Sequence, residues 1–175
     1  MIIDINFRKK IKFIENFPKE GVNFVDYSSI FNNKATFIEL KRYICKLLDG
    51  AALIDYVVGI ESRGFTFAAM ISTIYNIPLV LVRKKGKLPN KVFSFTYDTE
   101  YSSDCVEIQR TDIKKDKTYL IVDDVLATGG TLNAVKQLIE DNKGIVNSAF
   151  VFIDCNLNDC KFNKNKLLKI MDVKQ

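Results

Sequence analysis

YLIVDDVLATGGT, residues 119–131, is the stretch of this 175-residue chain that predicts its fold. Its first four residues are apolar, which is typical of a strand buried on both faces of a parallel sheet. Two carboxylates, Asp123 and Asp124, follow at the carboxyl end of the strand, where open α/β sheets bind ligands. An Asp-Asp pair alone is more often a simple strand end than a site, so its meaning depends on the loop that follows.

The loop after the two carboxylates combines hydroxyls, permissive glycines and the start of a helical pattern. Backbone N–H groups at such a turn, together with the helix dipole, favour a bound phosphate. A Walker loop would need a lysine before its last hydroxyl residue, and the stretch has none. The stretch therefore offers acceptors for hydroxyl groups and donors for an anion, as a ribose phosphate requires. The loop consists of Ala127, Thr128, Gly129, Gly130 and Thr131.

The composition, with 47% apolar and 27% charged residues, predicts one globular domain over residues 1–175. The absence of histidine excludes Ser-His and Cys-His nucleophiles and makes a zinc site built by the protein improbable. No apolar run reaches membrane-spanning length, and scattered cysteines without a secretory signal favour a reduced cytosol. The net charge of +5 fits either nucleic acid or phosphorylated metabolites. Much of it lies in residues 161–175, KFNKNKLLKIMDVKQ, which we expect to be a solvated tail.

Hydrophobic periodicity predicts strands that alternate with helices along most of the chain. We expect a short helix at residues 11–17 and a longer one at residues 35–48, capped by Asn33 and closed by Gly50. The alternation predicts a doubly wound, mainly parallel α/β sheet with an N-terminal arm and an antiparallel excursion near residues 90–110. The remaining elements are expected at residues 56–60, 65–75, 79–82, 93–97, 106–108, 132–140 and 145–153.

Three polar segments follow predicted strands, at residues 61–64, 83–87 and 123–131. A parallel sheet brings these strand ends to one edge, where they could line a single crevice. Arg63 lies near a helix start, where the helix dipole disfavours a cation, so a bound anion would explain its position. Taken alone, the basic run at residues 83–87 is most often a solvated face, and Glu100 is most often a loop acid.

Together the segments resemble the adenine phosphoribosyltransferases of the type I phosphoribosyltransferase fold. The resemblance is close at YVVGIESRGF, at LVRKKGKLP, at the TEY of YDTEYSSDCVEIQ and at LIVDDVLATGGT, and it covers nearly all of residues 18–155. VDDVLATGGT alone indicates the wider phosphoribosyltransferase fold. The RKKGKLP segment with the Glu-Tyr pair downstream indicates the adenine enzymes.

The resemblance implies an enzyme that converts adenine and 5-phosphoribosyl 1-pyrophosphate to AMP and pyrophosphate. The reaction would be a displacement at ribose C1′ without a covalent intermediate, with Mg²⁺ carried mostly by the substrate. The resemblance also implies a cytoplasmic homodimer with an N-terminal hood at residues 1–33 and a flexible catalytic loop at residues 84–104. Neither nucleic acid nor a membrane is an expected partner.

Individual roles follow from the matched motifs. Glu100 and Arg63 would be catalytic, with Glu100 hydrogen-bonding or exchanging a proton at adenine N7. The ribose hydroxyls and the 5′-phosphate would be held by Asp123, Asp124, Ala127, Thr128, Gly129, Gly130 and Thr131. Pyrophosphate would be held by Glu61, Ser62, Arg63, Arg83, Lys84 and Lys87. Adenine would lie among Asn23, Phe24, Val25 and Val125.

The chain departs from the family pattern at three places. Val25 stands where many relatives have arginine, Ser102 replaces the usual glycine after Glu-Tyr, and Asp154-Cys155 replaces a common Glu-Leu. These changes bear on the base pocket and the closing loop, and not on the class of reaction.

Three alternatives remain beside this interpretation. A purine phosphoribosyltransferase that accepts hypoxanthine, guanine or xanthine is the nearest, and RKKGKLP with the Glu-Tyr pair argues against it. A non-catalytic sensor of the sugar pyrophosphate is the second, although residues 1–35 lack a helix-turn-helix pattern and Glu100 favours catalysis. A nucleic-acid binder is disfavoured because the chain lacks an aromatic RNP-type strand and a concentrated basic helix.

Overall fold

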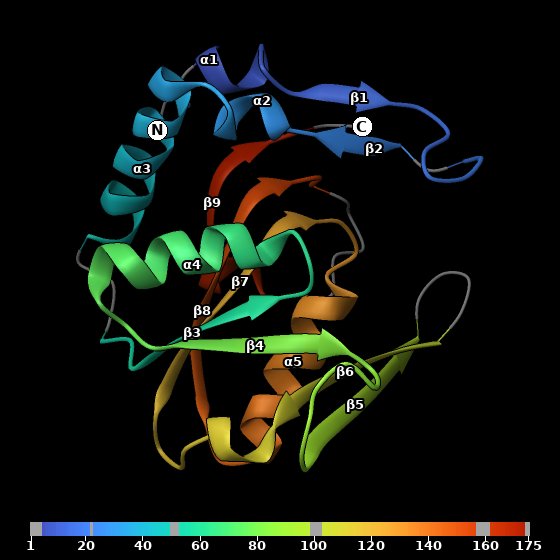
Figure 1. Ribbon diagram of the computed structural model, residues 1–175, viewed down its shortest axis with the longest axis vertical. Helices are drawn as coiled ribbons and strands as arrows, with labels where there is room; N and C mark the ends of the chain where they lie inside the picture. Colours follow the sequence, from blue (N-terminus) through green and yellow to red (C-terminus); the bar gives the residue numbers. More distant parts are fainter. Residues whose placement is uncertain (1–4, 22, 50–52, 99–102, 157–161, 174–175) are drawn as a thin grey trace. The chain divides into compact units, whose positions relative to one another are not determined.

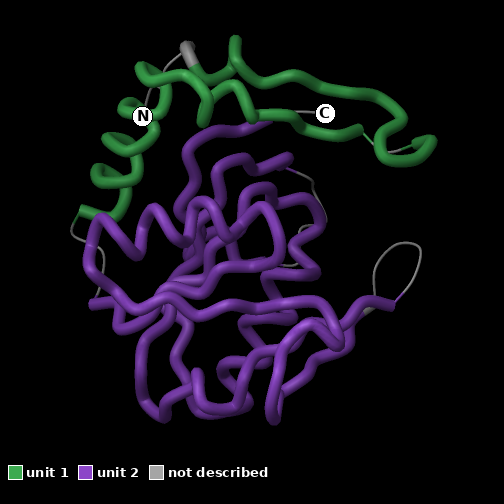
Figure 2. Tube along the Cα trace, viewed as in Figure 1, with its two compact units in different colours: residues 1–49 green, residues 50–175 purple. Residues whose placement is uncertain are grey.

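The computed structural model describes residues 5–21, 23–49, 53–98, 103–156 and 162–173. The chain divides into two compact units, residues 1–49 and residues 50–175, which Figure 2 shows in different colours. The first unit extends beyond the predicted arm at residues 1–33 to the end of a long helix. Its elements are α1 (Ile5–Arg8), β1 (Lys12–Ile14), β2 (Phe24–Asp26), α2 (Ser28–Phe31) and α3 (Lys34–Leu48).

The helix expected at residues 11–17 is wrong, because β1 occupies part of this segment. β1 pairs antiparallel with β2, and Phe13 lies opposite Val25. Asn16 takes a left-handed φ of 57°, and its side chain accepts a hydrogen bond from Gly21 N at 2.9 Å. Gly21 and the partner strand β2 lie outside the predicted window, so local periodicity could not reveal the turn or the pairing.

The helix expected at residues 35–48 is confirmed as α3. The side chain of Asn33 accepts hydrogen bonds from Ala35 N at 3.1 Å and Thr36 N at 3.2 Å, as expected of an N-cap. Gly50, the predicted end of this helix, lies outside the described residues. Within the described ranges, none of the helices combines the length and apolar character needed to cross a membrane.

The second unit is a seven-stranded, mainly parallel sheet in the order β5-β6-β4-β3-β7-β8-β9, as the doubly wound prediction requires. Neighbouring strands from β4 to β9 pair in parallel, and β6 and β5 add an antiparallel edge. The elements are β3 (Tyr56–Ile60), α4 (Gly64–Tyr75), β4 (Leu79–Lys84), β5 (Val92–Asp98), β6 (Ser103–Gln109), η1 (Arg110–Asp112), β7 (Thr118–Leu126), α5 (Gly130–Asp141), β8 (Ile145–Asp154), η2 (Lys164–Lys166) and β9 (Leu167–Asp172).

The two long helices of this unit cover opposite faces of the sheet (Figure 1). On the α4 side, the ring of Phe67 packs against Phe150 and Phe152 of β8. On the other side, the buried residues of α5, such as Leu138, pack with alternate strand residues, such as Ile121. β7 is buried on both faces, as its unbroken apolar run predicts.

The solvated tail expected at residues 161–175 is wrong, because β9 runs through it as the last strand of the sheet. β9 pairs in parallel with β8, and Ile170 and Met171 are buried. Lys169 donates to the fully buried Asp154 at 2.8 Å. The sequence pattern predicts that the lysines of this segment are solvated. Lys169 is instead partly buried, because its partner, Asp154, lies on the neighbouring strand.

Candidate active site

The carboxyl ends of the central strands bring together an arginine and two carboxylates that lie sixty residues apart in sequence. β3 and β7 pair so that Gly59 lies opposite Val122, and therefore residues just beyond each strand become neighbours. Arg63 Nη2 lies 2.5 Å from Asp124 Oδ2. The predicted convergence of these two strand ends is thus confirmed.

The two adjacent carboxylates have different environments. Asp124 is 8% exposed and pairs with Arg63, while its backbone N–H donates to Asp123 Oδ1 at 2.9 Å. Burial, together with the neighbouring charge of Asp124, raises the pKa of Asp123 well above its ordinary value. The pair therefore combines a carboxylate paired with a cation and a carboxyl group whose charged form is disfavoured by burial.

Gly64 allows the start of α4 to approach the end of β7. A Cβ at this position would lie 2.8 Å from Val122 O and 3.0 Å from Asp123 Oδ1, which is closer than side-chain carbons tolerate. Only glycine leaves the space that lets Arg63, the residue before it, reach Asp124. The preceding Glu61–Ser62 peptide bond is cis.

Glu61 holds the basic segment at the end of β4. Its carboxylate accepts hydrogen bonds from Lys87 Nζ at 2.6 Å, from Lys84 N at 2.9 Å and from Arg83 Nη2 at 3.3 Å. Burial alone would raise the pKa of Glu61, but these donors outweigh it and lower the pKa to about 2. Glu61 thus holds the side chains of Arg83 and Lys87, together with the backbone of Lys84, beside the end of β4.

The loop that precedes α5 joins a left-handed glycine to the start of the helix, and its role in binding a phosphate stays a prediction. Gly129 is buried and takes a left-handed φ of 76°, a conformation that glycine adopts without strain. α5 begins directly after it at Gly130, so the N-terminal backbone N–H groups of a twelve-residue helix lie beside Thr128 and Thr131.

Tyr97 and Asp104 connect this loop to the basic segment, and sequence reasoning missed both. The hydroxyl of Tyr97 lies 3.0 Å from Thr131 Oγ1 and 3.5 Å from Asp104 Oδ2, and Asp104 also pairs with Lys84 Nζ. Tyr97 and Asp104 lie opposite each other on β5 and β6. The alternating pattern on either side of residues 99–102 could have indicated this cross-strand pair, but not its contact with α5.

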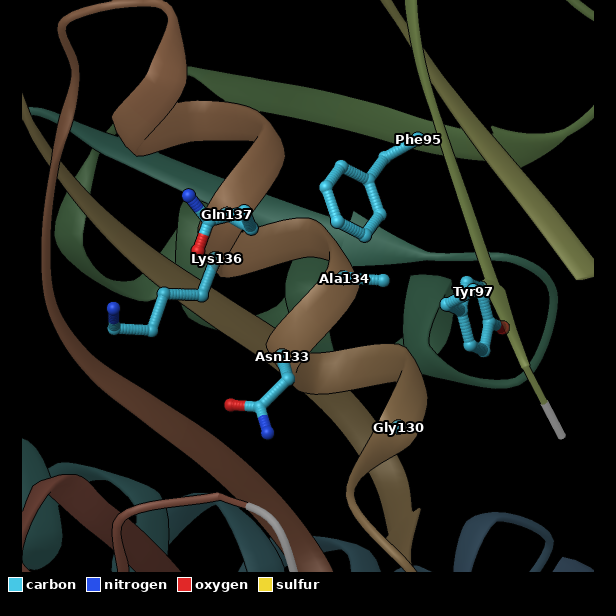
Figure 3. Close-up of a pocket in the computed structure, with 7 residues that line it drawn as sticks. All are labelled: Phe95, Tyr97, Gly130, Asn133, Ala134, Lys136 and Gln137. Carbon is cyan, nitrogen blue, oxygen red and sulfur yellow. The ribbon is translucent and has the colours of Figure 1, made fainter.

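A pocket beside α5 shares Tyr97 with this cluster. Figure 3 shows the rings of Phe95 and Tyr97 next to the first turns of the helix, on the side toward which Ala134 points. The pocket is lined by Phe95, Tyr97, Gly130, Asn133, Ala134, Lys136 and Gln137.

The residues predicted to bind adenine and the predicted catalytic Glu100 lie in several parts of the chain. Val125 is half-buried in β7. Asn23, Phe24 and Val25 belong to the first unit, where the ring of Phe24 packs edge-on against Phe17 at 5.1 Å. Glu100 lies outside the described residues, as does Ser102. The roles of these residues in binding adenine and in catalysis stay predictions.

Comparison with known proteins identifies relatives along almost the whole chain. A family model described as a phosphoribosyl transferase domain matches residues 26–173. The adenine phosphoribosyltransferase of Clostridium novyi is 42% identical over 157 residues, which cover 90% of each chain. Among solved structures, an adenine phosphoribosyltransferase from Thermoanaerobacter pseudethanolicus has a TM-score of 0.87 at 30% identity, with 96% of this chain and 98% of that chain covered.

A second solved structure was determined with ligands. The adenine phosphoribosyltransferase of Saccharomyces cerevisiae, complexed with D-2,5-dideoxy-2,5-imino-altritol 1,6-bisphosphate and adenine, has a TM-score of 0.84 at 33% identity. The similarity covers 95% of this chain and 97% of that one.

Proposed function

The chain belongs to the adenine phosphoribosyltransferase family, and we propose how its residues share the reaction of that family. The reaction converts adenine and 5-phosphoribosyl 1-pyrophosphate to AMP and pyrophosphate in purine salvage. The observation that carries the proposal is the convergence of the Arg63–Asp124 ion pair with the glycine loop before α5, at the carboxyl edge of one sheet.

The proposed roles follow the charges that develop in the reaction. Displacement of pyrophosphate from C1′ leaves positive charge on the ribose ring and negative charge on the leaving group. Asp123 and Asp124 would bind the ribose hydroxyls, and the loop at residues 127–131 would bind the 5′-phosphate. Arg63 would stabilise the departing pyrophosphate, because a cation fixed at that position needs no rearrangement when the charge appears.

The basic segment would complete the pyrophosphate site, with Glu61 acting through its neighbours. The Glu61 carboxylate would repel a phosphate, but it holds Arg83 and Lys87 in one place. We propose that this preorganisation is the contribution of Glu61, and that Lys84, Arg83 and Lys87 provide the charge. Ser62 would contribute from the turn between β3 and α4.

Mg²⁺ would enter on the sugar pyrophosphate. Among the residues that the structure describes, no group of three or more carboxylates or thiols is arranged to hold a metal ion. We propose that most ligands of Mg²⁺ are substrate oxygens, as is usual for this ion beside phosphates. The oxygens of Asp123 and Asp124 suit such an ion as hard ligands, directly or through the ribose hydroxyls. When bound, Mg²⁺ would neutralise charge on the leaving pyrophosphate. Removing the ion with a chelator should abolish turnover.

Following the matched motifs, we propose that Asn23, Phe24, Val25 and Val125 bind adenine and that Glu100 acts at its N7. A spectrophotometric assay with Mg²⁺, 5-phosphoribosyl 1-pyrophosphate and adenine, hypoxanthine, guanine or xanthine in separate cuvettes tests this specificity. Product with adenine alone supports it, whereas product with a 6-oxopurine means that the pocket was assigned to the wrong base. Binding of the sugar pyrophosphate without any product would instead favour a sensor.

We also propose a homodimer. Leu79 and Leu81 of β4 point to the same face of the sheet and are each 37% exposed, whereas Val80 and Val82 between and beyond them are buried. A second copy that covers these leucines would remove an exposed apolar strip from water. Light scattering on the purified protein gives its mass, and a monomer at micromolar concentration would exclude the dimer.

A cytoplasmic location is proposed as well. Cys105 and Cys155 are free thiols, which suits a reducing compartment. Cell fractionation with an antibody against the native chain would test this location.

A further inference from the structure

Lys84, Asp104, Tyr97 and Thr131 form a continuous line of polar contacts between the two predicted phosphate-binding segments. Lys84 Nζ pairs with Asp104 Oδ2, which lies 3.5 Å from the Tyr97 hydroxyl, which in turn lies 3.0 Å from Thr131 Oγ1. Lys84 ends β4, and Thr131 lies in the first turn of α5. The line therefore crosses the space between the proposed pyrophosphate and 5′-phosphate sites.

Asp104 neutralises a cation that the substrate would need. Burial by itself would raise the pKa of Asp104, but the hydrogen bond and the charge of Lys84 outweigh it, and the pKa is lowered. Asp104 is therefore an anion at neutral pH. The side chains of Lys84 and Asp104 are 40% and 33% exposed, so a dissolved anion can reach them.

We propose that Asp104 is an internal competitor for Lys84, whose carboxylate the incoming pyrophosphate group must displace. This inference rests on the proposed role of Lys84 in binding pyrophosphate. A half-exposed ion pair is weak, so the displacement is easy and its removal should change affinity by about two- to fivefold. Asp104 is not required for the chemistry, and it lowers the affinity for a group that the enzyme must also release.

Tyr97 connects Asp104 to Thr131, which belongs to the proposed 5′-phosphate loop. A phenol has a single proton, and the Tyr97 hydroxyl faces two acceptors, the nearer Thr131 Oγ1 and the more distant Asp104 Oδ2. While Lys84 occupies Asp104, the proton of Tyr97 can go to Thr131 Oγ1. The hydroxyl proton of Thr131 is then left to point at a phosphate. Tyr97 is thus a positioning residue that acts through Thr131.

The location of the pair suits this coupling. Tyr97 and Asp104 are opposite each other in the β5–β6 register, and the chain between these strands carries Glu100. Displacement of Asp104 from Lys84 therefore changes the contacts of a residue that the β5–β6 pairing holds opposite Tyr97.

The first experiment titrates pyrophosphate with Mg²⁺ into the parent and into Asp104→Asn by calorimetry. We expect Asp104→Asn to bind about two- to fivefold more tightly, with a steeper dependence on salt, because Lys84 has lost its internal anion. Asp116→Asn is the matched control, since it removes the same charge at an exposed turn residue with a φ of 61°, which asparagine tolerates. Unchanged or weaker binding by Asp104→Asn would overturn the proposal.

Lys84→Met separates this inference from the proposed function. If Lys84 binds pyrophosphate, Lys84→Met weakens binding, and adding Asp104→Asn to it brings no gain. If Lys84→Met binds pyrophosphate as tightly as the parent, Lys84 does not bind pyrophosphate, and the inference about Asp104 is wrong as well. If Lys84→Met weakens binding while Asp104→Asn changes nothing, only the internal competitor is wrong.

Tyr97→Phe tests the contact between Tyr97 and Thr131. The ring stays, and the contacts of its hydroxyl with Thr131 and Asp104 are lost, so we expect AMP to bind about two- to tenfold more weakly while pyrophosphate binding is unchanged. Tyr56→Phe, on β3, is the control for removing a tyrosine hydroxyl. Equal losses for AMP and pyrophosphate would indicate general loosening of the structure and would overturn the positioning role.

Discussion

Replacing Gly64 with alanine should separate the geometry of the site from the stability of the fold. The added Cβ would lie 2.8 Å from Val122 O, 3.0 Å from Asp123 Oδ1 and 3.1 Å from Asp123 Cα. Two of these atoms are backbone and cannot rotate away. The start of α4 must therefore move away from the end of β7, and Arg63 moves with it.

The size of both effects can be worked from this contact. Overpacking in a well-packed region costs about 1–3 kcal/mol of the free energy of unfolding. Separating Arg63 from Asp124 by a few tenths of an ångström loosens a pair that is now 2.5 Å apart. Since a misplacement of about 1 Å can cost on the order of a hundredfold in rate, we expect kcat/KM to fall about tenfold or more.

Gly144→Ala is the matched control at the opposite end of the strands. Its Cβ would lie 2.6 Å from Ile139 Cγ2 and 2.9 Å from Tyr119 Cε2, so it overpacks by a similar amount. Denaturant unfolding should show comparable destabilisation of both variants. Steady-state kinetics, corrected for the folded fraction, should show a defect only in Gly64→Ala. Parent-like kinetics in Gly64→Ala, or an equal defect in Gly144→Ala, would refute the reasoning.

Three further substitutions test individual side chains. Asp124→Asn should raise the KM for 5-phosphoribosyl 1-pyrophosphate about tenfold or more, because a charge-assisted partner of Arg63 is lost; unchanged kinetics would remove that role. Glu100→Gln should lower kcat more than affinity if it exchanges a proton at N7, and a variant as fast as the parent contradicts this. Glu61→Gln should cost about 1–2 kcal/mol of unfolding free energy at neutral pH, after allowance for the half-exposed Lys87. Because the pKa of Glu61 falls from 4.5 to about 2 on folding, that difference should be complete above pH 4.5 and disappear as the pH approaches 2; a difference independent of pH argues against it.

Much of the central sheet could be predicted because its signals are local. The apolar run of β7 and the alternation of strands and helices require only neighbouring residues, and the carboxyl ends of parallel strands meet by geometry. That is why the convergence of Arg63 with Asp124 was expected before any contact was known. The cap at Asn33 is predictable for the same reason, since its partners lie within three residues.

The failures of prediction lie where long-range partners outweigh local pattern. Residues 12–14 form a strand because β2 pairs with them, and residues 167–172 form one because β8 does. The lysines there suggested a solvated segment, although Lys169 is held by the buried Asp154.

By itself the sequence determined the fold class, the family and the loops that we propose bind a sugar phosphate, because these depend on periodicity and on motifs within short windows. Only the tertiary structure decided which charged side chains pair with one another. In the folded chain Asp104 pairs with Lys84, and the hydroxyl of Tyr97 contacts Thr131. Arg83 and Lys87 both pair with Glu61. The physical reason is that such pairs are set by strand register and helix placement, which join side chains separated by twenty or more residues along the chain.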